Sequence, residues 1–218
     1  MDQLAQSVLI VVVIVVMGWF ALGIVRNIRR GNAVLRWMQV GLPKLGERTT
    51  VRWLGSSAVD LNIAKAKPPF RQVQLLIVLE PRDVPWFWVI AHARGRRDML
   101  IVRGQLPTPP QYEFDLIAPS SWSESERSGR PEARQWAAEP FGDLSFRAPS
   151  TTRSLSRAIA PDALNAARQV HPIVWRLSAH RDDPQLELHI PLPNPNKLDA
   201  TQFFAAVRTL AEQMSRRQ

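Results

Sequence analysis

Residues 8–25 read VLIVVVIVVMGWFALGIV, a run of eighteen residues without a charged side chain. With Ser7 added, an α-helix over this run is about 28 Å long, close to the roughly 30 Å hydrocarbon layer of a bilayer. A single segment in lipid can satisfy its backbone hydrogen bonds only as a helix. We therefore predict a transmembrane helix over residues 7–25, with the lipid bilayer as its partner.

A cleaved signal peptide is the main alternative for this run. Such a peptide has a basic N-terminal region and a small-x-small cleavage site. Residues 1–6 contain no base, and the run ends in Gly23-Ile24-Val25-Arg26. The flanking residues therefore favour an anchor that is not cleaved.

Positive charge is concentrated directly after the apolar run. Residues 26–44 contain no acid, whereas the only charge before the run is Asp2. By the positive-inside rule we expect a single pass through the cell (inner) membrane, with the N-terminus outside and the remainder cytoplasmic. We assign residues 26–45 as a basic juxtamembrane segment, and the residues expected to flank the membrane are Arg26, Arg29, Arg30 and Arg36.

Two interpretations are open for Asn32–Val40, which reads as a short helix capped by Asn32 and ended by Gly41. Its apolar residues Val34, Leu35 and Met38 form a stripe. Together with the neighbouring arginines, the stripe predicts an interfacial helix that lies on the inner leaflet. In the alternative, the stripe packs on the domain that follows.

Residues 46–216 predict one cytoplasmic α+β domain with antiparallel hairpins first and helices at its C-terminal end. The strands Thr49–Trp53 and Val59–Ile63 alternate apolar and polar residues around a Gly55 turn. One register pairs Trp53 with Val59 and also sets Arg52 opposite Asp60. The same register therefore gives apolar pairs on one face of the hairpin and a pair of opposite charges on the other.

Two further hairpins follow from the same reasoning. Phe87–Ala93 pairs with Asp98–Gly104 around Gly95-Arg96, and Ile173–Ala179 pairs with Leu186–Ile190. Val73–Leu79 is almost continuously apolar, which predicts a strand covered on both faces.

The last third of the chain changes character twice. Residues 118–150 are polar and rich in turn formers, which predicts a long mobile loop. Residues 151–160 predict a helix, and Pro161 begins a second helix that ends near Val170. A last helix begins after Asp199, and its apolar stripe consists of Phe203, Val207, Leu210 and Met214.

No residue pattern in the sequence predicts catalysis, a metal site or a cofactor. The chain has no cysteine, and its four histidines occur outside any metal-binding spacing. In the predicted third hairpin His189 faces Arg176 while His180 faces Gln185, too far apart to share an ion. His92 is expected to be a buried core histidine.

Two features are the strongest candidates for binding. The first is a basic hairpin tip formed by Arg94, Arg96 and Arg97, which suits an anionic partner. The second is the pair Trp86 and Trp88, which share one face if the segment is a strand. A core role for the two tryptophans and a solvated turn for the arginines are the competing interpretations.

The sequence thus favours a non-enzymatic, membrane-tethered interaction or scaffold protein with protein partners. The alternative is a membrane-tethered binding module for an anionic ligand, either a lipid headgroup or a nucleic acid, that uses the Arg94–Arg97 tip. The formal net charge of +9 lies about half beside the apolar run, so the domain itself does not favour nucleic acid. The third hypothesis is an enzyme without a recognisable motif.

Overall fold

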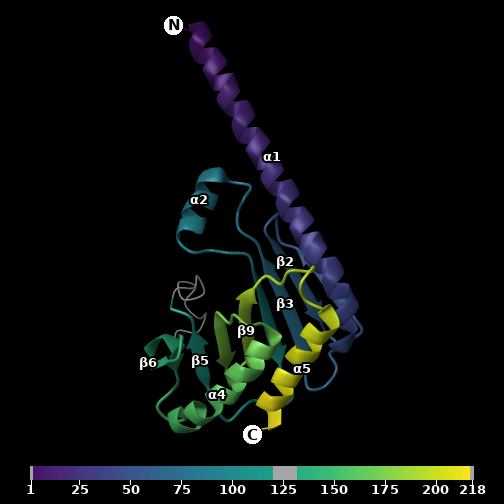
Figure 1. Cartoon of the computed structure of the whole chain (residues 1–218), viewed down its shortest axis with the longest axis vertical. Helices are drawn as coiled ribbons and strands as arrows, with labels where there is room; N and C mark the ends of the chain where they lie inside the picture. Colours follow the sequence, from purple (N-terminus) through teal and green to yellow (C-terminus); the bar gives the residue numbers. More distant parts are fainter. Residues whose placement is uncertain (1, 120–131, 217–218) are drawn as a thin grey trace.

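An unbroken helix, α1 (Asp2–Gly41), forms the N-terminal part of the computed structural model, which describes residues 2–119 and 132–216. Its first half projects away from the rest of the protein, and its second half lies along the domain (Figure 1). The side chains from Val8 to Met17 are exposed, between 36% and 64% each. By length and composition, α1 is the one helix among the described residues that is apolar enough to cross a membrane.

Nine strands within the described residues form one antiparallel sheet in the order β1-β2-β3-β4-β9-β8-β5-β7-β6. The strands are β1 (Thr49–Trp53), β2 (Ala58–Ile63), β3 (Gln72–Val78), β4 (Met99–Gln105), β5 (Phe114–Ile117), β6 (Ala138–Phe141), β7 (Leu144–Arg147), β8 (Arg176–Ala179) and β9 (Leu186–Pro191). The other elements are η1 (Leu42–Lys44), α2 (Pro85–Ala93), η2 (Glu132–Gln135), α4 (Arg153–Val170) and α5 (Ala200–Arg216).

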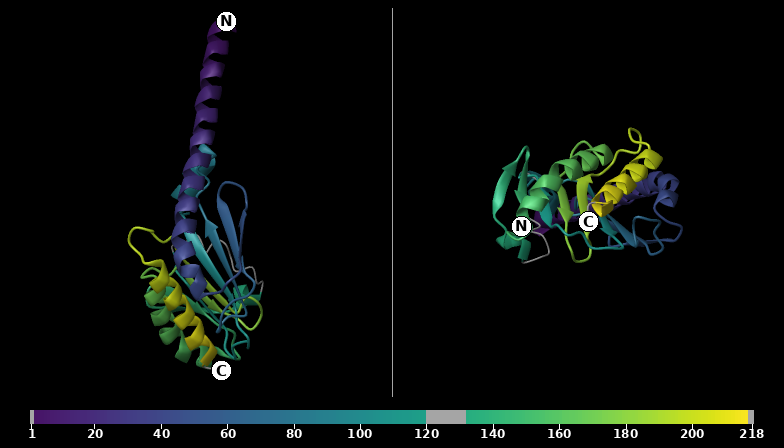
Figure 2. Two further views of the ribbon diagram at one scale, coloured as in Figure 1. Left: turned by 90° about the vertical axis from the view of Figure 1, so that its right-hand side faces the viewer. Right: turned by 90° about the horizontal axis from the view of Figure 1, so that it is seen from below.

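The helices α4, α5 and the lower part of α1 lie on one side of the sheet (Figure 2). The strand residues that face them are apolar and form the core, for example Leu61, Ile77, Leu100 and Leu188, each 0% exposed. This arrangement confirms the predicted α+β class with an antiparallel sheet and C-terminal helices.

Polar side chains alternate with the core residues and form a row across the other face of the sheet. Cross-strand register places in this row Asn62, Gln74, Arg103, Glu187, Ser178, Asp115 and Arg147. In β3, only Val73, Leu75 and Ile77 are fully buried. The prediction that this strand is covered on both faces is therefore wrong, since one face takes part in the polar row.

The second half of α1 belongs to the core. Met38 is 0% exposed, and the Trp37 ring lies 5.3 Å from the Phe203 ring and 6.1 Å from the Phe204 ring on α5. The prediction of a separate interfacial helix over Asn32–Val40 is wrong, and its alternative, packing on the domain, is confirmed. No helix begins at Asn32, because α1 is continuous from Asp2 to Gly41.

The close approach of α1 and α5 depends on a glycine. A Cβ added at Gly41 would lie 2.4 Å from the carbonyl oxygen of Ala200 and from the Phe204 ring. The α5 stripe is buried as predicted, and the Asp199 carboxylate accepts a hydrogen bond from the Gln202 N–H at 2.8 Å as an N-terminal cap.

Two of the predicted hairpins are confirmed with their registers. In β1 and β2, Arg52 pairs with Asp60 and Trp53 with Val59. In β8 and β9, Arg176 pairs with His189. In both cases alternation and turn residues determine the pairing locally, so no distant contact is needed to choose it.

The region predicted as a mobile loop contains regular structure. Residues 120–131 lie outside the described residues, but β6 and β7 pair with each other and add to the sheet beside β5. The helix predicted to break at Pro161 is continuous as α4. A proline inside a helix costs about 3 kcal/mol, and the buried residues on both sides of it, such as Ile159 and Leu164, offset that cost.

We predict that Met38→Ala lowers the free energy of unfolding by about 2–5 kcal/mol, because it leaves a cavity between α1 and α5. Val40→Ala is the control: Val40 is on the same helix but 69% exposed, so its effect stays within about 0.5 kcal/mol. Denaturant unfolding of the full chain in detergent, followed by tryptophan fluorescence, measures both. Equal losses would show that the stripe is not packed on the domain.

Candidate functional site at the junction of α1 and α2

One face of α1 contacts the loop that follows β3. Trp19, Gly23, Asn27 and Arg30 are spaced four, four and three residues apart, so they share one stripe of the helix. The Trp19 Nε1 donates a hydrogen bond to the Arg82 carbonyl oxygen at 3.0 Å. A Cβ added at Gly23 would lie 2.2 Å from the same oxygen. Two backbones meet here, and only a residue without a side chain allows that approach.

A buried polar network connects this stripe to the ends of β3 and β4. Asn27, 0% exposed, donates to the Glu80 carbonyl oxygen at 3.0 Å and accepts from Arg82 Nη1 at 3.2 Å. The Asp98 carboxylate accepts from the Glu80 N–H at 2.8 Å and from both Arg82 Nη atoms at 2.9 and 3.1 Å. Arg30 Nε lies 2.5 Å from Asp98 Oδ2. Buried charges are tolerated only when paired and hydrogen-bonded, so the network determines how α1 lies on the domain.

The segment after this network is a helix, α2, where the sequence predicted a strand. Pro85 lies in the first turn, where its missing N–H has no partner to lose. Gly95 follows the helix with φ +82°, and its N–H donates to the His92 carbonyl oxygen at 3.0 Å. The predicted hairpin of Phe87–Ala93 with Asp98–Gly104 is therefore wrong. The proline at the start and the glycine after the end were the sequence signals that indicated a helix.

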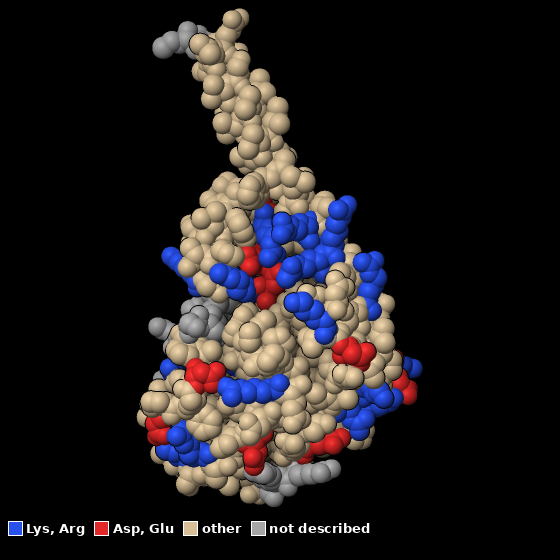
Figure 3. All heavy atoms as spheres, in the orientation of Figure 1, with Lys and Arg blue, Asp and Glu red and all other residues tan. Residues whose placement is uncertain are grey.

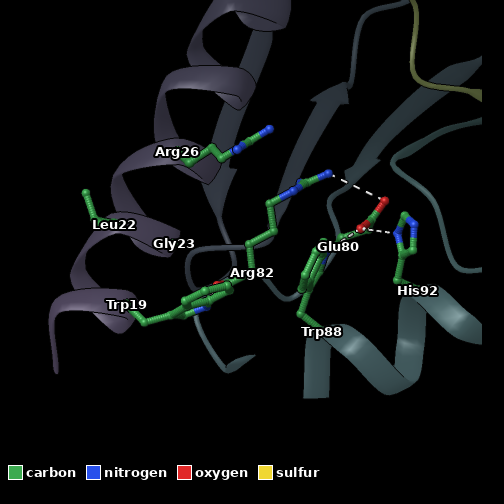
Figure 4. Close-up of a pocket in the computed structure, with 8 residues that line it drawn as sticks. All are labelled: Trp19, Leu22, Gly23, Arg26, Glu80, Arg82, Trp88 and His92. Carbon is green, nitrogen blue, oxygen red and sulfur yellow. Dashed lines mark hydrogen bonds and ion pairs between the residues drawn. The ribbon is translucent and has the colours of Figure 1, made fainter. Parts of the chain in front are cut away.

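One side of α2 faces the junction. Trp88 and His92 are four residues apart, and both reach the carboxylate of Glu80 (Figure 4). Trp88 Nε1 donates to Glu80 Oε2 at 2.6 Å, and His92 Nδ1 lies 3.1 Å from the same oxygen. The ring of Trp88 also lies 6.2 Å from that of Trp19. His92 is thus not the buried core histidine that was predicted, since its side chain is 46% exposed.

The other side of α2 is an exposed apolar surface. It consists of four residues, which are Trp86 (60% exposed), Phe87 (56%), Val89 (56%) and Ile90 (49%). No residue of α2 is buried. Because two residues turn an α-helix by about 200°, Trp86 and Trp88 point to different sides, which corrects the prediction of a shared face. A contiguous exposed apolar surface marks an interaction site.

A cavity of about 440 Å³ lies between α1, α2 and the loop after β3. It is lined by Trp19, Leu22, Gly23, Arg26, Glu80, Arg82, Trp88 and His92 (Figure 4). The acid in this wall is already engaged, since Glu80 contacts Arg82 at 3.5 Å as well as the two α2 side chains. The cavity therefore combines the rings of two tryptophans with the two arginines Arg26 and Arg82, at the level where the apolar run of α1 ends.

The basic residues singled out in the sequence lie in two groups beside this junction. Arg26, Arg29 and Arg36 are exposed on α1, whereas Arg30 pairs with Asp98. Lys and Arg side chains gather around the end of the domain from which α1 projects (Figure 3).

The second group does not form a hairpin tip. Arg94, Arg96 and Arg97 follow the C-terminal end of α2, where positive charge complements the helix dipole. Arg97 Nη1 donates to the carbonyl oxygens of His92 and Arg96 at 2.8 and 2.7 Å. The predicted hairpin tip is therefore wrong, and these arginines lie at the C-terminal end of a helix.

A second charged cluster lies in the polar row of the sheet. Asp115, 1% exposed, contacts Arg176 Nη2 at 3.2 Å and His180 Nε2 at 3.1 Å. The two histidines of the β8–β9 hairpin contact different carboxylates. Within the described part of the chain, no group of three or more His, Asp or Glu side chains is arranged to hold a metal ion.

The neighbouring pair in this row is centred on Glu187 of β9. Arg103 Nε lies 3.2 Å from Glu187 Oε2, and His189 Nε2 lies 2.5 Å from Glu187 Oε1. Burial by itself would raise the pKa of this carboxyl, but the His189 hydrogen bond, together with the charges of His189 and Arg103, lowers the pKa to about 2. Burial would likewise raise the pKa of Asp115. The contacts with His180 and Arg176 outweigh this effect and hold the pKa of Asp115 well below its ordinary value.

No model of a known protein family matches this chain, and no curated protein sequence matches it. The site is therefore interpreted from its own geometry and charges.

We predict that Gly23→Ala destabilises the full chain by about 1–3 kcal/mol, because the added methyl group forces α1 away from the Arg82 carbonyl. Gly18→Ala is the matched control, since a Cβ there meets no atom within 4 Å. Thermal unfolding in detergent measures stability, and trypsin cleavage at Arg82 reports on the loop. If the two variants behave alike, the backbone contact does not form.

We predict that stability falls as the pH is lowered from about 4.5 to about 2. A carboxyl whose folded pKa is depressed contributes stability above its ordinary pKa and loses that contribution as the pH falls through the folded value. Glu187→Gln should therefore be less stable at neutral pH, by on the order of 3 kcal/mol, and its stability should change less over this acid range.

Urea unfolding of the full chain in detergent, repeated at several pH values, measures this effect. Asp143→Asn is the control, because that carboxylate is 71% exposed and pairs with Arg168 at the surface. An unchanged acid profile in Glu187→Gln would contradict the role of the Glu187 pair.

Proposed function

We propose that this protein is a non-enzymatic, membrane-tethered interaction or scaffold protein. In this proposal α1 crosses the cell (inner) membrane once, with the N-terminus outside and the α+β domain in the cytoplasm. The observation that carries the proposal is the continuity of α1, which is an exposed apolar helix at one end and part of the domain core at the other.

The exposed half of α1 supports membrane insertion. Ten consecutive apolar side chains, from Val8 to Met17, are between 36% and 64% exposed. Burying one large apolar side chain contributes about 1.5–3 kcal/mol, so water is a costly surrounding for this segment and lipid a favourable one. Cleavage after the apolar run would also remove Trp19 and Gly23, and with them the contact to Arg82. That loss favours an anchor over a cleaved signal.

The charges around the junction support the cytoplasmic orientation. Five bases follow the apolar run within twenty residues, and only Asp2 precedes it. The arginines after α2 lie on the same side of the apolar run. Both groups are therefore placed to meet the phosphate-rich surface of the inner leaflet.

The state of the buried acids supports a non-enzymatic role. Catalytic acids and bases usually have a pKa near the working pH and room for a substrate proton. Here Asp98 accepts hydrogen bonds from a backbone N–H and a guanidinium, and the pKa values of Asp115 and Glu187 are lowered by their ion pairs. These carboxylates act as fixed structural charges, which suits a rigid binding module.

A second candidate function is binding of an anionic ligand through Arg94, Arg96 and Arg97. The observation in its favour is that these residues directly follow the apolar α2 beside α1. That position suits a lipid headgroup better than a nucleic acid, which would need a longer basic surface. A salt-dependent affinity for anionic vesicles, absent for neutral ones, would support this candidate.

We predict that the full chain stays in the membrane fraction after a carbonate wash, because α1 is inserted in lipid. A fluorescent protein fused after Gln218 should be fluorescent, and an exported phosphatase fused there should be inactive. Arg26→Glu with Arg29→Glu should weaken this orientation, whereas Arg48→Glu with Arg71→Glu, exposed bases further along the chain, should not.

Release by carbonate would overturn the anchor, and an active phosphatase fusion would overturn the orientation. The scaffold role is tested by cross-linking in intact membranes followed by purification in mild detergent, where a defined protein partner should copurify. A chain that repeatedly purifies without any partner would contradict it.

A further inference from the structure

We infer that α2 is a second membrane contact, inserted beside α1 into the leaflet on the domain side. The apolar side chains of α2 then lie among lipid chains, and the arginines that follow it lie among the headgroups. This inference rests on the proposed function and deepens it, because it requires α1 to be anchored in the same bilayer.

The length of α1 gives the first reason. The domain contacts α1 from Trp19 onward, through the hydrogen bond to the Arg82 carbonyl. The free apolar part, Val8 to Gly18, is then only about 17 Å long, roughly half of a 30 Å hydrocarbon layer. To span the layer, the apolar run must be used as far as Val25. The loop at Arg82 and α2, which lie beside Trp19 and Leu22, are thereby brought to the depth of the leaflet.

The composition of α2 suits that depth. Pro85–Ala93 contains no Asp, Glu, Lys or Arg, and its exposed large apolar residues are two aromatic and two aliphatic side chains. Trp88 Nε1 and His92 Nδ1 point away from this surface, since both contact Glu80. As a helix, α2 also pairs part of its own backbone, for example the Arg94 N–H with the Ile90 carbonyl oxygen at 3.0 Å, which a single strand could not do.

The Glu80–Arg82–Asp98 network can lie near this depth because its charges are paired. Asp98 is 4% exposed and Glu80 5% at the side chain, and Arg82 bonds to both. Figure 4 shows Glu80 and Arg82 between α1 and the Trp88 side of α2.

Arginines follow both of the apolar segments that are proposed to insert. Arg94, Arg96 and Arg97 begin directly after α2, and Arg26 begins directly after the apolar run of α1. Both apolar segments thus end at arginines, which is typical of the boundary between hydrocarbon and headgroups. Figure 3 shows the basic side chains gathered around this end of the domain.

Lipid is favoured over a soluble partner because the α2 surface continues an apolar surface that already requires lipid. Phe20 and Leu22 of α1 are 42% and 73% exposed at the same level. Figures 1 and 2 both show α2 beside α1, beyond the end of the sheet. With α1 and α2 both inserted, the domain cannot swing about a single point, so it presents a fixed face to its partners.

The absence of native cysteines allows a direct test with single-cysteine variants of the full chain. Ile90→Cys reports on α2 and Val15→Cys on the anchor. Val51→Cys on β1 is the control, because Val51 and Ile90 are both 49% exposed. Each variant is labelled with an environment-sensitive fluorophore and reconstituted in vesicles of phosphatidylcholine and phosphatidylglycerol, with or without nitroxide-labelled lipids. Unfolding curves identical to that of the unsubstituted chain confirm that the labelled variants are folded.

We expect nitroxide lipids to reduce fluorescence at position 90 about as strongly as at position 15, and to leave position 51 unchanged. Quenching at 15 without quenching at 90 would overturn this inference and leave the anchor intact. Quenching at neither position would overturn the anchor and this inference together. If position 90 is shielded from lipid and cross-links to a second copy of the chain, the surface is a dimer interface and the inference also fails.

Discussion

The continuity of α1 constrains the rest of this protein. Helices bend sharply at proline, at glycine–serine pairs or at bulges, and α1 contains no proline from Asp2 to Gly41. The end that packs on α5 therefore determines the direction in which the apolar end leaves the domain. Gly41 and Gly23 set how closely the helix approaches α5 and the loop after β3. A flexible tether would leave the domain free to rotate, whereas this helix connects the two parts rigidly.

The polar contacts of Asn27 and Arg30 select one position of α1 on the domain. An apolar contact between α1 and the loop could slide by one turn, whereas Asn27 and Arg30 each have a single set of partners. Buried ion pairs often add little net stability, and their best-supported role is to select one arrangement among several. Asp98 illustrates this role, because it joins the backbone at Glu80, the side chain of Arg82 and the helix through Arg30.

The loop after β3 also contacts α2 through Glu80. Glu80 accepts the Trp88 hydrogen bond and contacts His92. Both side chains can reach one carboxylate only when the segment is helical, because four residues rise about 6 Å along a helix and about 13 Å along a strand. The helix then turns its remaining apolar residues outward. An arrangement that is unfavourable for a soluble protein is thus held in place by charged contacts, and the proposed membrane contact supplies the missing cover.

Sequence alone was sufficient where the determining interactions are local. The β1–β2 and β8–β9 registers and the α5 stripe follow from periodic patterns, and each physical period belongs to one kind of element. The apolar run and its basic flank are visible from composition alone. The α+β class followed from these patterns. The hairpin β6–β7 was missed because each of its strands is only four residues long. In addition, β6 has no buried residue, and two of its four residues are alanine and proline, which are uncommon in strands.

Tertiary structure decided the elements whose sequence fits two states. A nine-residue apolar segment such as α2 is compatible with a strand or a helix. Pro85 and Gly95 indicate the helix locally, whereas its contacts with Glu80 exist only in the folded chain. The Asn32–Val40 stripe suits a leaflet or a core equally, and packing against α5 selected the core. The candidate site joins residues of α1 with residues more than fifty positions later. No local pattern encodes such a contact, because it exists only once the chain has folded.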